Sequence, residues 1–385
     1  MKNKSTNIIS IISINTLRQV LLSVFNMVIP FMVVQHLSKE IWGEFVSLLL
    51  YSLLVTQIIN WGNKEYLLRK FSETPSTIKV DFSSILLTRF PLVLLFSLVG
   101  FFFFGIESGC YLTIWILGRF LIHSYEVLVV YEKKFNVSSI IELCCFLIFV
   151  ILFYSLSSAI NLEKLLIVYS FYQLNKGICY LLFFKDTFSL NTSFNFTYYK
   201  NSIWFLLLSI FGFLASKIDV YIIEQFDNKT ATSDYQIING LLVFIMSIST
   251  FIYTPFTKNI YRNSYFTIEK TKKVLAVIGL IIVPISLLFV YGILHYFLNL
   301  KLTIWFYFVA FLYVFPSYVY GIEIISLFKQ HKEKRVVLFL FIGTICNWML
   351  SFMLLKVHFG IIENLIGGAI AQLVIMFLFK SKKII

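Results

Sequence analysis

Apolar residues dominate this chain in runs of about 20, and short polar stretches between the runs carry most of the charge. A helix needs about 20 apolar residues to cross roughly 30 Å of hydrocarbon, so each run predicts a membrane-spanning helix. The pattern predicts twelve spans, near residues 8–34, 45–62, 83–105, 110–131, 138–157, 161–184, 201–224, 236–257, 273–298, 302–327, 336–356 and 361–379. The sequence therefore predicts an all-α polytopic membrane protein.

Composition supports this class. The 385 residues are 59% hydrophobic and only 13% charged, whereas a soluble domain is about 45–50% apolar and roughly 25% charged. A soluble domain, a secreted disulfide scaffold and a disordered chain are therefore excluded. The five cysteines lie in apolar runs without paired spacing, so we interpret them as small hydrophobic residues and expect no metal site.

The distribution of lysine and arginine predicts the orientation. With the N-terminus in the cytoplasm, 22 of the 32 cationic side chains fall on the cytoplasmic side and only 5 fall on the opposite side. The positive-inside rule then places both termini in the cytoplasm. The net charge of +13 thus indicates orientation and contact with anionic membrane lipids, and it does not indicate a nucleic-acid partner.

Five cations remain inside the predicted spans: Arg18, Arg89, Arg119, Lys176 and Lys217. A cation at the bilayer centre costs about 2.5–3.5 kcal/mol on insertion scales, and such side chains normally face a bundle interior or an aqueous cavity. Arg89 and Lys217 lie nearer to helix ends, where snorkelling to the headgroups is the alternative. For the other three, internal salt bridges are the alternative.

Helical periodicity places polar residues beside three of these cations. The polar faces comprise Asn15, Arg18, Gln19 and Asn26 on the first span, Arg119, His123 and Glu126 on the fourth, and Tyr169, Ser170, Gln173, Lys176 and Tyr180 on the sixth. A water-filled passage between helices requires such faces, whereas a lipid-facing helix gains nothing from them. A structural charge pair between Arg119 and Glu126 is the alternative interpretation.

Acidic residues within the spans are candidates for coupling transport to an ion. Asp219 follows Lys217 by two residues, about 200° around the helix, so a direct pair between them is not expected. Glu323 is the best acidic candidate in the second half of the chain, and Glu126 is a third candidate. Glu142 lies near a cytoplasmic helix end, and we expect it at the membrane interface.

Motifs of common enzyme classes are absent from the sequence. There is no Walker A loop, no GxSxG elbow, no HExxH sequence and no EF-hand loop, and the connections are too short for a soluble catalytic domain. The sequence therefore favours a transporter over an enzyme, and it predicts no cofactor.

Four stretches near helix ends combine proline, glycine or basic residues with particular neighbours. They are Pro30 with HLSKEIWGEF at residues 36–45, NWG at 60–62 with Arg69 and Lys70, KIDVYII at 217–223 with Tyr235, and STFIYTP at 249–255. These stretches resemble motifs of polysaccharide flippases of the multidrug/oligosaccharidyl-lipid/polysaccharide exporter superfamily. The resemblance implies two six-helix lobes, residues 1–190 and 191–385, around a central cavity.

The resemblance also implies a function. A flippase of this family moves an undecaprenyl-pyrophosphate-linked oligosaccharide, such as an O-antigen unit of lipopolysaccharide, to the periplasmic leaflet of the bacterial inner membrane. Polysaccharide polymerase and chain-length machinery are possible partners. The alternatives are a cation-coupled drug exporter of the same superfamily, for which an acidic cavity is expected, and a membrane-embedded polysaccharide transferase or polymerase.

The candidate site residues follow from this interpretation. The expected coupling residues are Asp219, Glu323 and Glu126, and the expected substrate-binding residues are Arg18, Gln19, Asn26, Arg89, Arg119, His123, Gln173, Lys176 and Lys217. Cations would replace the lost hydration of the phosphates, and amides would bind sugar hydroxyls. Alanine at Arg119 or Lys176 is expected to abolish translocation and to leave membrane insertion intact.

Overall fold

The computed structural model describes residues 2–156, 161–189, 192–226, 228–253, 265–330, 332–357 and 360–381, with backbone only for 2–13, 265–267 and 357. These residues contain no strand, which confirms the all-α class. The chain forms two compact units, Met1–Ile210 and Phe211–Ile385. The predicted boundary between residues 190 and 191 stays a prediction.

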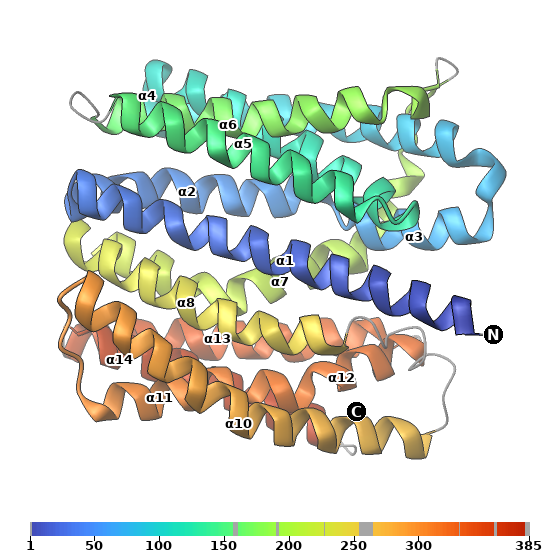
Figure 1. Ribbon diagram of the computed structural model, residues 1–385. Helices are drawn as coiled ribbons and strands as arrows, with labels where there is room; N and C mark the ends of the chain where they lie inside the picture. The colour runs from blue at the N-terminus through green and yellow to red at the C-terminus, as the bar shows by residue number, and fades with distance from the viewer. Residues whose placement is uncertain are drawn as a thin grey trace. The chain divides into compact units, whose positions relative to one another are not determined.

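Unit 1 consists mainly of long helices (Figure 1). Its helices are α1 (Lys2–His36), α2 (Lys39–Asn60), α3 (Asn63–Glu73), α4 (Ile78–Tyr131), α5 (Phe135–Leu156), α6 (Leu162–Phe183) and the start of α7 (Thr197–Phe226). Ser38 caps α2, because its hydroxyl accepts a hydrogen bond from the backbone N–H of Ile41 at 3.1 Å. The N-terminal motif of residues 36–45 thus starts a helix.

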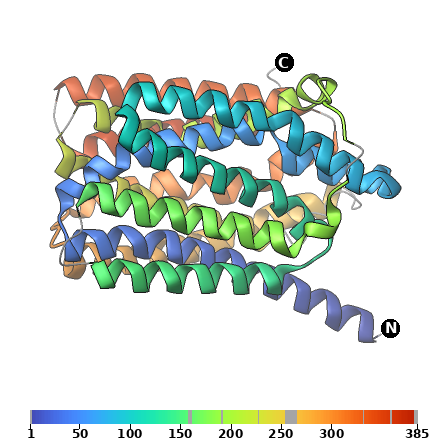
Figure 2. The same ribbon diagram turned by 90° about the horizontal axis from the view of Figure 1, so that it is seen from above.

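Helix α4 contains two predicted spans in one continuous 54-residue segment. At 1.5 Å per residue a straight helix of this length would extend about 80 Å, far beyond a bilayer of roughly 30 Å. Gly105 reverses the chain with φ 76° and ψ 176°. The two arms then run side by side (Figure 2), since a Cβ added at Gly109 would lie 3.0 Å from the Cα of Phe101.

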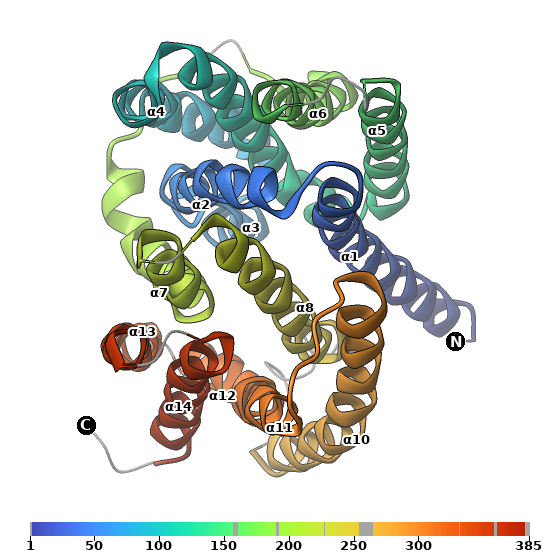
Figure 3. The same cartoon turned by 90° about the vertical axis from the view of Figure 1, so that its left-hand side faces the viewer.

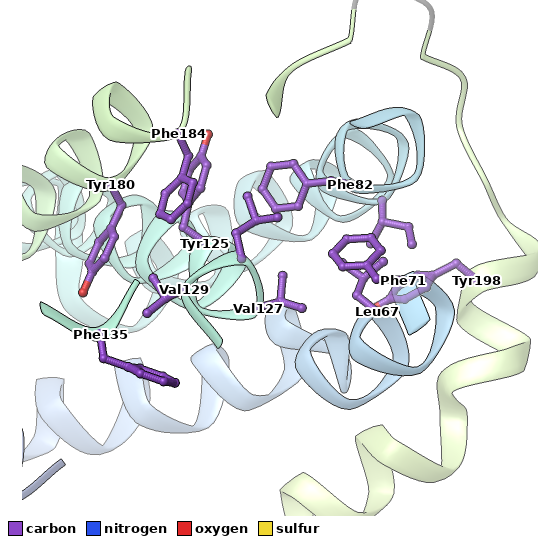
Figure 4. Packing of buried hydrophobic residues seen from close by; sticks show 12 residues of the cluster. Leu67, Phe71, Phe82, Tyr125, Val127, Val129, Phe135, Tyr180, Phe184 and Tyr198 are labelled. Atoms are coloured by element: carbon purple, nitrogen blue, oxygen red, sulfur yellow. The ribbon is translucent and has the colours of Figure 1, made fainter. Parts of the chain in front are cut away.

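A tight turn after α2 directs the short amphipathic helix α3 back onto unit 1. Trp61 and Gly62 both adopt positive φ, at 47° and 64°, a conformation that glycine adopts at no steric cost. Leu67 and Phe71 of α3 are fully buried in an aromatic core with Phe82 (Figure 4). Helix α3 is therefore a fixed part of the unit, although its sequence is polar on one side.

The second arm of α4 packs directly against α6 (Figure 3). A Cβ added at Gly118 would lie 2.5 Å from the carbonyl carbon of Gln173, and one at Gly177 would lie 2.9 Å from the carbonyl oxygen of Gly118. Small residues at both positions let the two backbones approach closely, as is common between membrane helices. This contact places the polar faces of α4 and α6 next to each other.

Gly118→Ala is expected to lower the free energy of unfolding by about 1–3 kcal/mol, because the added methyl group collides with backbone atoms of α6. Gly240→Ala is the control, since no atom lies within 4 Å of its added Cβ and alanine favours a helix by about 1 kcal/mol over glycine. Thermal unfolding of the purified variants in detergent measures the stability of each variant. Equal midpoints for the two variants would contradict the close α4–α6 contact.

The described residues of unit 2 contain the rest of α7 and the helices α8 (Lys229–Tyr253), α10 (Tyr265–Phe297), α11 (Ile304–Val314), α12 (Pro316–Lys329), α13 (Glu333–Val357) and α14 (Ile361–Lys380). Helices α11 and α12 are consecutive, and Pro316 opens α12. Proline lacks the backbone N–H that would continue the hydrogen-bond ladder, which explains the break between them. Together these two helices form one predicted span.

Ten helical segments of the described chain are long and apolar enough to cross a membrane. One of them, Pro75–Tyr131, contains the two predicted spans of α4. Helix α6, predicted as a span, is 22 residues long but is not among the ten, because its polar face lowers its hydropathy. The predicted span ends at 157 and 254–257, with Pro255, lie outside the described residues.

Candidate functional site

Seven ionisable side chains of unit 1 converge from five helices, and we call them the unit 1 charge cluster. They are Arg18 of α1, Lys64 of α3, Arg119, His123 and Glu126 of α4, Glu142 of α5 and Lys176 of α6. Arg18 contacts both Glu126 and Ser138, and Arg119 and His123 line the same small cavity. The cluster contains four cations and two carboxylates, and Glu65, next to Lys64 on α3, is a third carboxylate beside it. Cations therefore outnumber carboxylates by one.

The deeper part of the cluster is a buried hydrogen-bonded chain. Lys176 forms an ion pair with Glu142, and both side chains are at least nine-tenths buried. The Tyr180 hydroxyl donates to Oε1 of Glu142 at 3.3 Å and lies 2.6 Å from the Ser138 hydroxyl. Arg18 Nε donates to that same serine oxygen at 2.6 Å. The expectation of an interfacial Glu142 was wrong, since distance from a helix end does not reveal which side faces a neighbouring helix.

The more accessible part of the cluster is centred on Glu126. Its Oε1 accepts a hydrogen bond from Lys64 Nζ at 3.0 Å and lies 4.0 Å from Arg18 Nη2. His123 Nδ1 lies 3.8 Å from Oε2. The side chains of Lys64, His123 and Glu126 are 34%, 34% and 24% exposed. The structure therefore pairs Glu126 with Lys64 and Arg18, and it does not form the alternative pair with Arg119.

Arg119 differs from the other cations of the cluster, because no acidic side chain of the described residues pairs with it. Its guanidinium lies over the Trp115 ring, 5.7 Å from the centroid, and the side chain is half-buried. Together with Arg89 and His123 it lines a cavity of about 10 Å³, room for about one water molecule. Arg119 is thus a cation without an acidic partner among the described residues, and it borders a small cavity.

Arg89 occupies a structural position. The side chain is 1% exposed, and its Nη1 donates to the carbonyls of Ile59 and Asn60 at 3.5 and 3.4 Å. Its Nη2 donates to the Ser124 hydroxyl at 2.8 Å. These carbonyls belong to the last turn of α2, where a cation is favourable. Arg89 therefore ties the end of α2 to both arms of α4 and does not snorkel.

The predicted amides are less closely connected to the cluster. Gln173 is buried against Gly118, Gln19 is half-buried and Asn26 is exposed. Within the described residues, their side chains form no hydrogen bond with another side chain. The structure thus brings together Arg18, Arg119, His123, Glu126 and Lys176 from the predicted set, and the roles of the three amides stay predictions.

A second polar network lies inside unit 2, around Asp219. This fully buried carboxylate accepts hydrogen bonds from the Tyr235 hydroxyl at 2.5 Å and from Asn239 Nδ2 at 3.4 Å. Lys217 Nζ donates to Asn239 Oδ1 at 2.5 Å. Asn239 therefore bridges Lys217 and Asp219, which form no direct ion pair with each other. Asn364 Nδ2 of α14 donates to the Asp219 carbonyl at 3.1 Å.

Glu323 lies in a separate ion-pair group. Its Oε1 is 2.5 Å from Lys272 Nζ, which also contacts Glu269 Oε1 at 3.1 Å. Across the described residues, no three histidine, cysteine, aspartate or glutamate side chains are placed to hold a metal ion. Among the acidic candidates of unit 2, Asp219 is thus the one that accepts hydrogen bonds from uncharged side chains and has no direct ion pair with a described residue.

Sequence reasoning missed several members of both networks. Lys64 lies between two predicted spans, among the cations assigned to the cytoplasmic side, although it is only two residues after the NWG turn. Ser138 and Asn239 gave no signal, because a single hydroxyl or amide in an apolar run is common. Tyr235 was noted only as part of a motif, and its contact with Asp219 shows the physical reason for that spacing.

The arrangement described above is that of a polytopic helical membrane protein. No protein-family model matches the chain, and no curated protein sequence matches it. Several solved structures are similar to this chain. The MATE multidrug transporter DinF-BH is 13% identical with a TM-score of 0.67, over 97% of this chain and 94% of that one.

Two further solved structures are similar over nearly the whole chain. The eukaryotic MATE transporter AtDTX14 is 12% identical with a TM-score of 0.61, over 97% of this chain and 93% of that one. The lipid II flippase MurJ, in an inward closed conformation, is 13% identical with a TM-score of 0.57, over 98% and 87%. This chain therefore shares the fold of these three proteins, two of which are MATE transporters and one a lipid II flippase.

Proposed function

We propose that this protein is a flippase that moves an undecaprenyl-pyrophosphate-linked oligosaccharide from the cytoplasmic to the periplasmic leaflet of a bacterial inner membrane. The observation that carries the proposal is the unit 1 charge cluster, whose four cations outnumber its two carboxylates and the neighbouring Glu65. Arg119 in particular has no acidic partner among the described residues. A cation without an acidic partner within membrane-spanning helices can bind an anionic substrate.

The physical problem that such a cluster solves is desolvation. Moving an unpaired charge into hydrocarbon costs tens of kcal/mol on an idealised Born estimate. Arginine binds phosphate with two parallel hydrogen bonds, and such charge-assisted bonds are about twice as strong as neutral ones. In this proposal Arg18 and Arg119 replace the hydration of the pyrophosphate, Lys176 acts mainly through its buried pair with Glu142, and Gln19, Asn26 and Gln173 bind sugar hydroxyls. The prenyl chain remains in the lipid.

We place the transport cycle in the alternating-access class, in which the bound head group faces first one side of the membrane and then the other. Each net negative charge that leaves the cytoplasm gains about 2.3 kcal/mol per 100 mV of negative-inside potential. Polysaccharide polymerase and chain-length machinery are the partners expected downstream. The electropositive cluster argues against the alternative of a drug exporter for cationic compounds, which needs an acidic site.

Asp219 is proposed as the coupling group, because its carboxylate is fully buried inside unit 2 and accepts hydrogen bonds from Tyr235 and Asn239. Asp219→Asn keeps the hydrogen bond from Tyr235 and removes the charge. The variant is expected to lose about tenfold of the flux driven by an imposed sodium or proton gradient, or about 1.4 kcal/mol. Glu323→Gln tests the other acidic candidate of unit 2, and Glu73→Gln, at an exposed carboxylate of α3, is the control. Unchanged gradient dependence in Asp219→Asn would remove Asp219 from the coupling.

The proposed function is tested with purified protein in liposomes. A fluorescent undecaprenyl-pyrophosphate oligosaccharide is placed in the inner leaflet, and its arrival outside is measured with a lectin. We expect flux that requires the protein, and no release of free sugar or transfer to a second lipid. Export of a cationic dye without lipid flux would support the drug exporter, and formation of new glycosidic bonds would support the transferase or polymerase.

A further inference from the structure

Glu126 is a carboxylate held between cations from two other helices. Lys64 of α3 donates to its Oε1 at 3.0 Å, and Arg18 of α1 approaches the same oxygen at 4.0 Å. The second distance exceeds that of a hydrogen bond, which is about 2.7–3.2 Å for N–H to oxygen. The carboxylate therefore satisfies only part of the hydrogen-bonding capacity of the two cations.

The unused donors can be counted from the chemistry of the side chains. An ammonium group has three donors and a guanidinium has five. In the described structure Lys64 uses one donor on Glu126, and Arg18 uses its Nε on Ser138. A diphosphate offers more acceptor oxygens than one carboxylate, and it matches the fork of an arginine. Glu126 is thus a weaker counter-ion than a diphosphate would be at this position.

The backbone fixes Lys64 at this position. The turn at Trp61 and Gly62 starts α3, and the buried side chains of Leu67 and Phe71 fix the helix to the core of unit 1 (Figure 4). Lys70 of the same helix instead donates to Asp81 Oδ1 at 2.7 Å, outside the cluster. The chain therefore offers two lysine–carboxylate pairs on one helix, of which only that of Lys64 joins the cluster.

Exposure indicates which part of the cluster an anion reaches first. The side chains of Lys64 and His123 are each 34% exposed, whereas that of Arg18 is 6% exposed. An arriving anion therefore meets Lys64 before it reaches Arg18. Glu126 lies between the two, where it competes with the anion for both cations.

We propose that Lys64 and Arg18 form the entry site for the diphosphate of the substrate, and that Glu126 is a built-in competitor that occupies this site until the diphosphate displaces it. The inference deepens the proposed function and rests on it for the identity of the passenger. It assigns Lys64 a binding role that its place after a helix end does not suggest. It also makes Glu126 a residue that limits affinity, so that loss of this carboxylate strengthens binding.

The test compares two variants that are expected to change the affinity for pyrophosphate in opposite directions. The full-length protein in detergent at low ionic strength is titrated with inorganic pyrophosphate by calorimetry, with sulfate as the comparator. Lys64→Gln is expected to weaken pyrophosphate binding about tenfold, and Glu126→Gln is expected to strengthen it severalfold. Lys70→Gln, the matched control on the same helix, is expected to leave the affinity unchanged. Lys64→Arg is expected to restore binding.

A purely structural tie between α3 and α4 predicts a different pattern. Lys64→Gln and Glu126→Gln would then change binding in the same direction, and both would lower the unfolding midpoint by similar amounts. That pattern, or equal effects of Lys64→Gln and Lys70→Gln, would overturn the inference. If the liposome assay shows flux of the lipid-linked sugar without the opposite-sign pattern, only the inference fails. If the pattern holds without flux, the proposed function fails, and the entry site serves another phosphorylated compound.

Discussion

Arg119→Ala is expected to reduce flux of the lipid-linked oligosaccharide by about 30-fold or more and to leave the protein folded and inserted. Arg119 has no acidic partner in the described chain, so its removal leaves no opposite charge buried and unpaired. Its contact with a bound phosphate is the interaction lost, and truncating one partner of a buried charge pair costs about 2–5 kcal/mol. The liposome assay measures the loss of flux, and thermal unfolding measures the stability.

The matched control for Arg119→Ala is Arg69→Ala. Arg69 pairs with Glu73 on α3 at 3.2 Å, and both side chains are more than half exposed. Exposed pairs of this kind contribute about 0–1 kcal/mol, so neither flux nor stability is expected to change. Arg119→Lys keeps the charge without the fork and is expected to recover part of the flux. Full flux in Arg119→Ala would remove this residue from the mechanism.

Lys176→Ala is expected to act mainly on stability, with a loss of about 3–5 kcal/mol. The ion pair between Lys176 and Glu142 is buried, and removal of one partner leaves the other charge without compensation. This changes the expectation drawn from the sequence, which gave Lys176→Ala a loss of translocation with insertion intact. Unfolding of the variant in detergent is the measurement.

A double variant separates the two roles of Lys176. Lys176→Met with Glu142→Gln removes both charges and is expected to recover most of the lost stability, since replacement of a whole buried pair is often neutral. If the double variant is stable and still transports the lipid, Lys176 serves the fold alone. A stable Lys176→Ala protein without flux would instead restore the direct role in substrate binding.

The sequence predicted the helices well because each span is a long apolar run. It also placed Arg18, Arg119, His123 and Lys176 on polar faces of three helices, which it expected to line a passage between helices. The reversal at Gly105 brings the third and fourth spans together, and the close contact at Gly118 shows that the fourth and sixth spans are neighbours. These features follow from local periodicity and from glycine chemistry.

The sequence did not predict which side chains on different helices contact each other. Glu142 seemed interfacial from its distance to a helix end, and only the packing of α5 against α6 shows that it faces Lys176. Lys64 is another example, since a lysine after a helix end normally lies in a solvated loop, and here α3 folds back. The bridge from Lys217 through Asn239 to Asp219 joins residues of two helices, and no spacing rule predicts it.

The central claim is that the unit 1 charge cluster binds an anionic head group. It is tested most directly by equilibrium binding of a short-chain prenyl-pyrophosphate oligosaccharide to the purified full-length protein. The comparison ligand carries the same sugar and the same chain through an uncharged linkage. We expect at least about tenfold tighter binding of the pyrophosphate ligand, weakening with salt and lost in Arg119→Ala. Equal binding of both ligands, or binding that does not change with salt or with Arg119, would contradict the account.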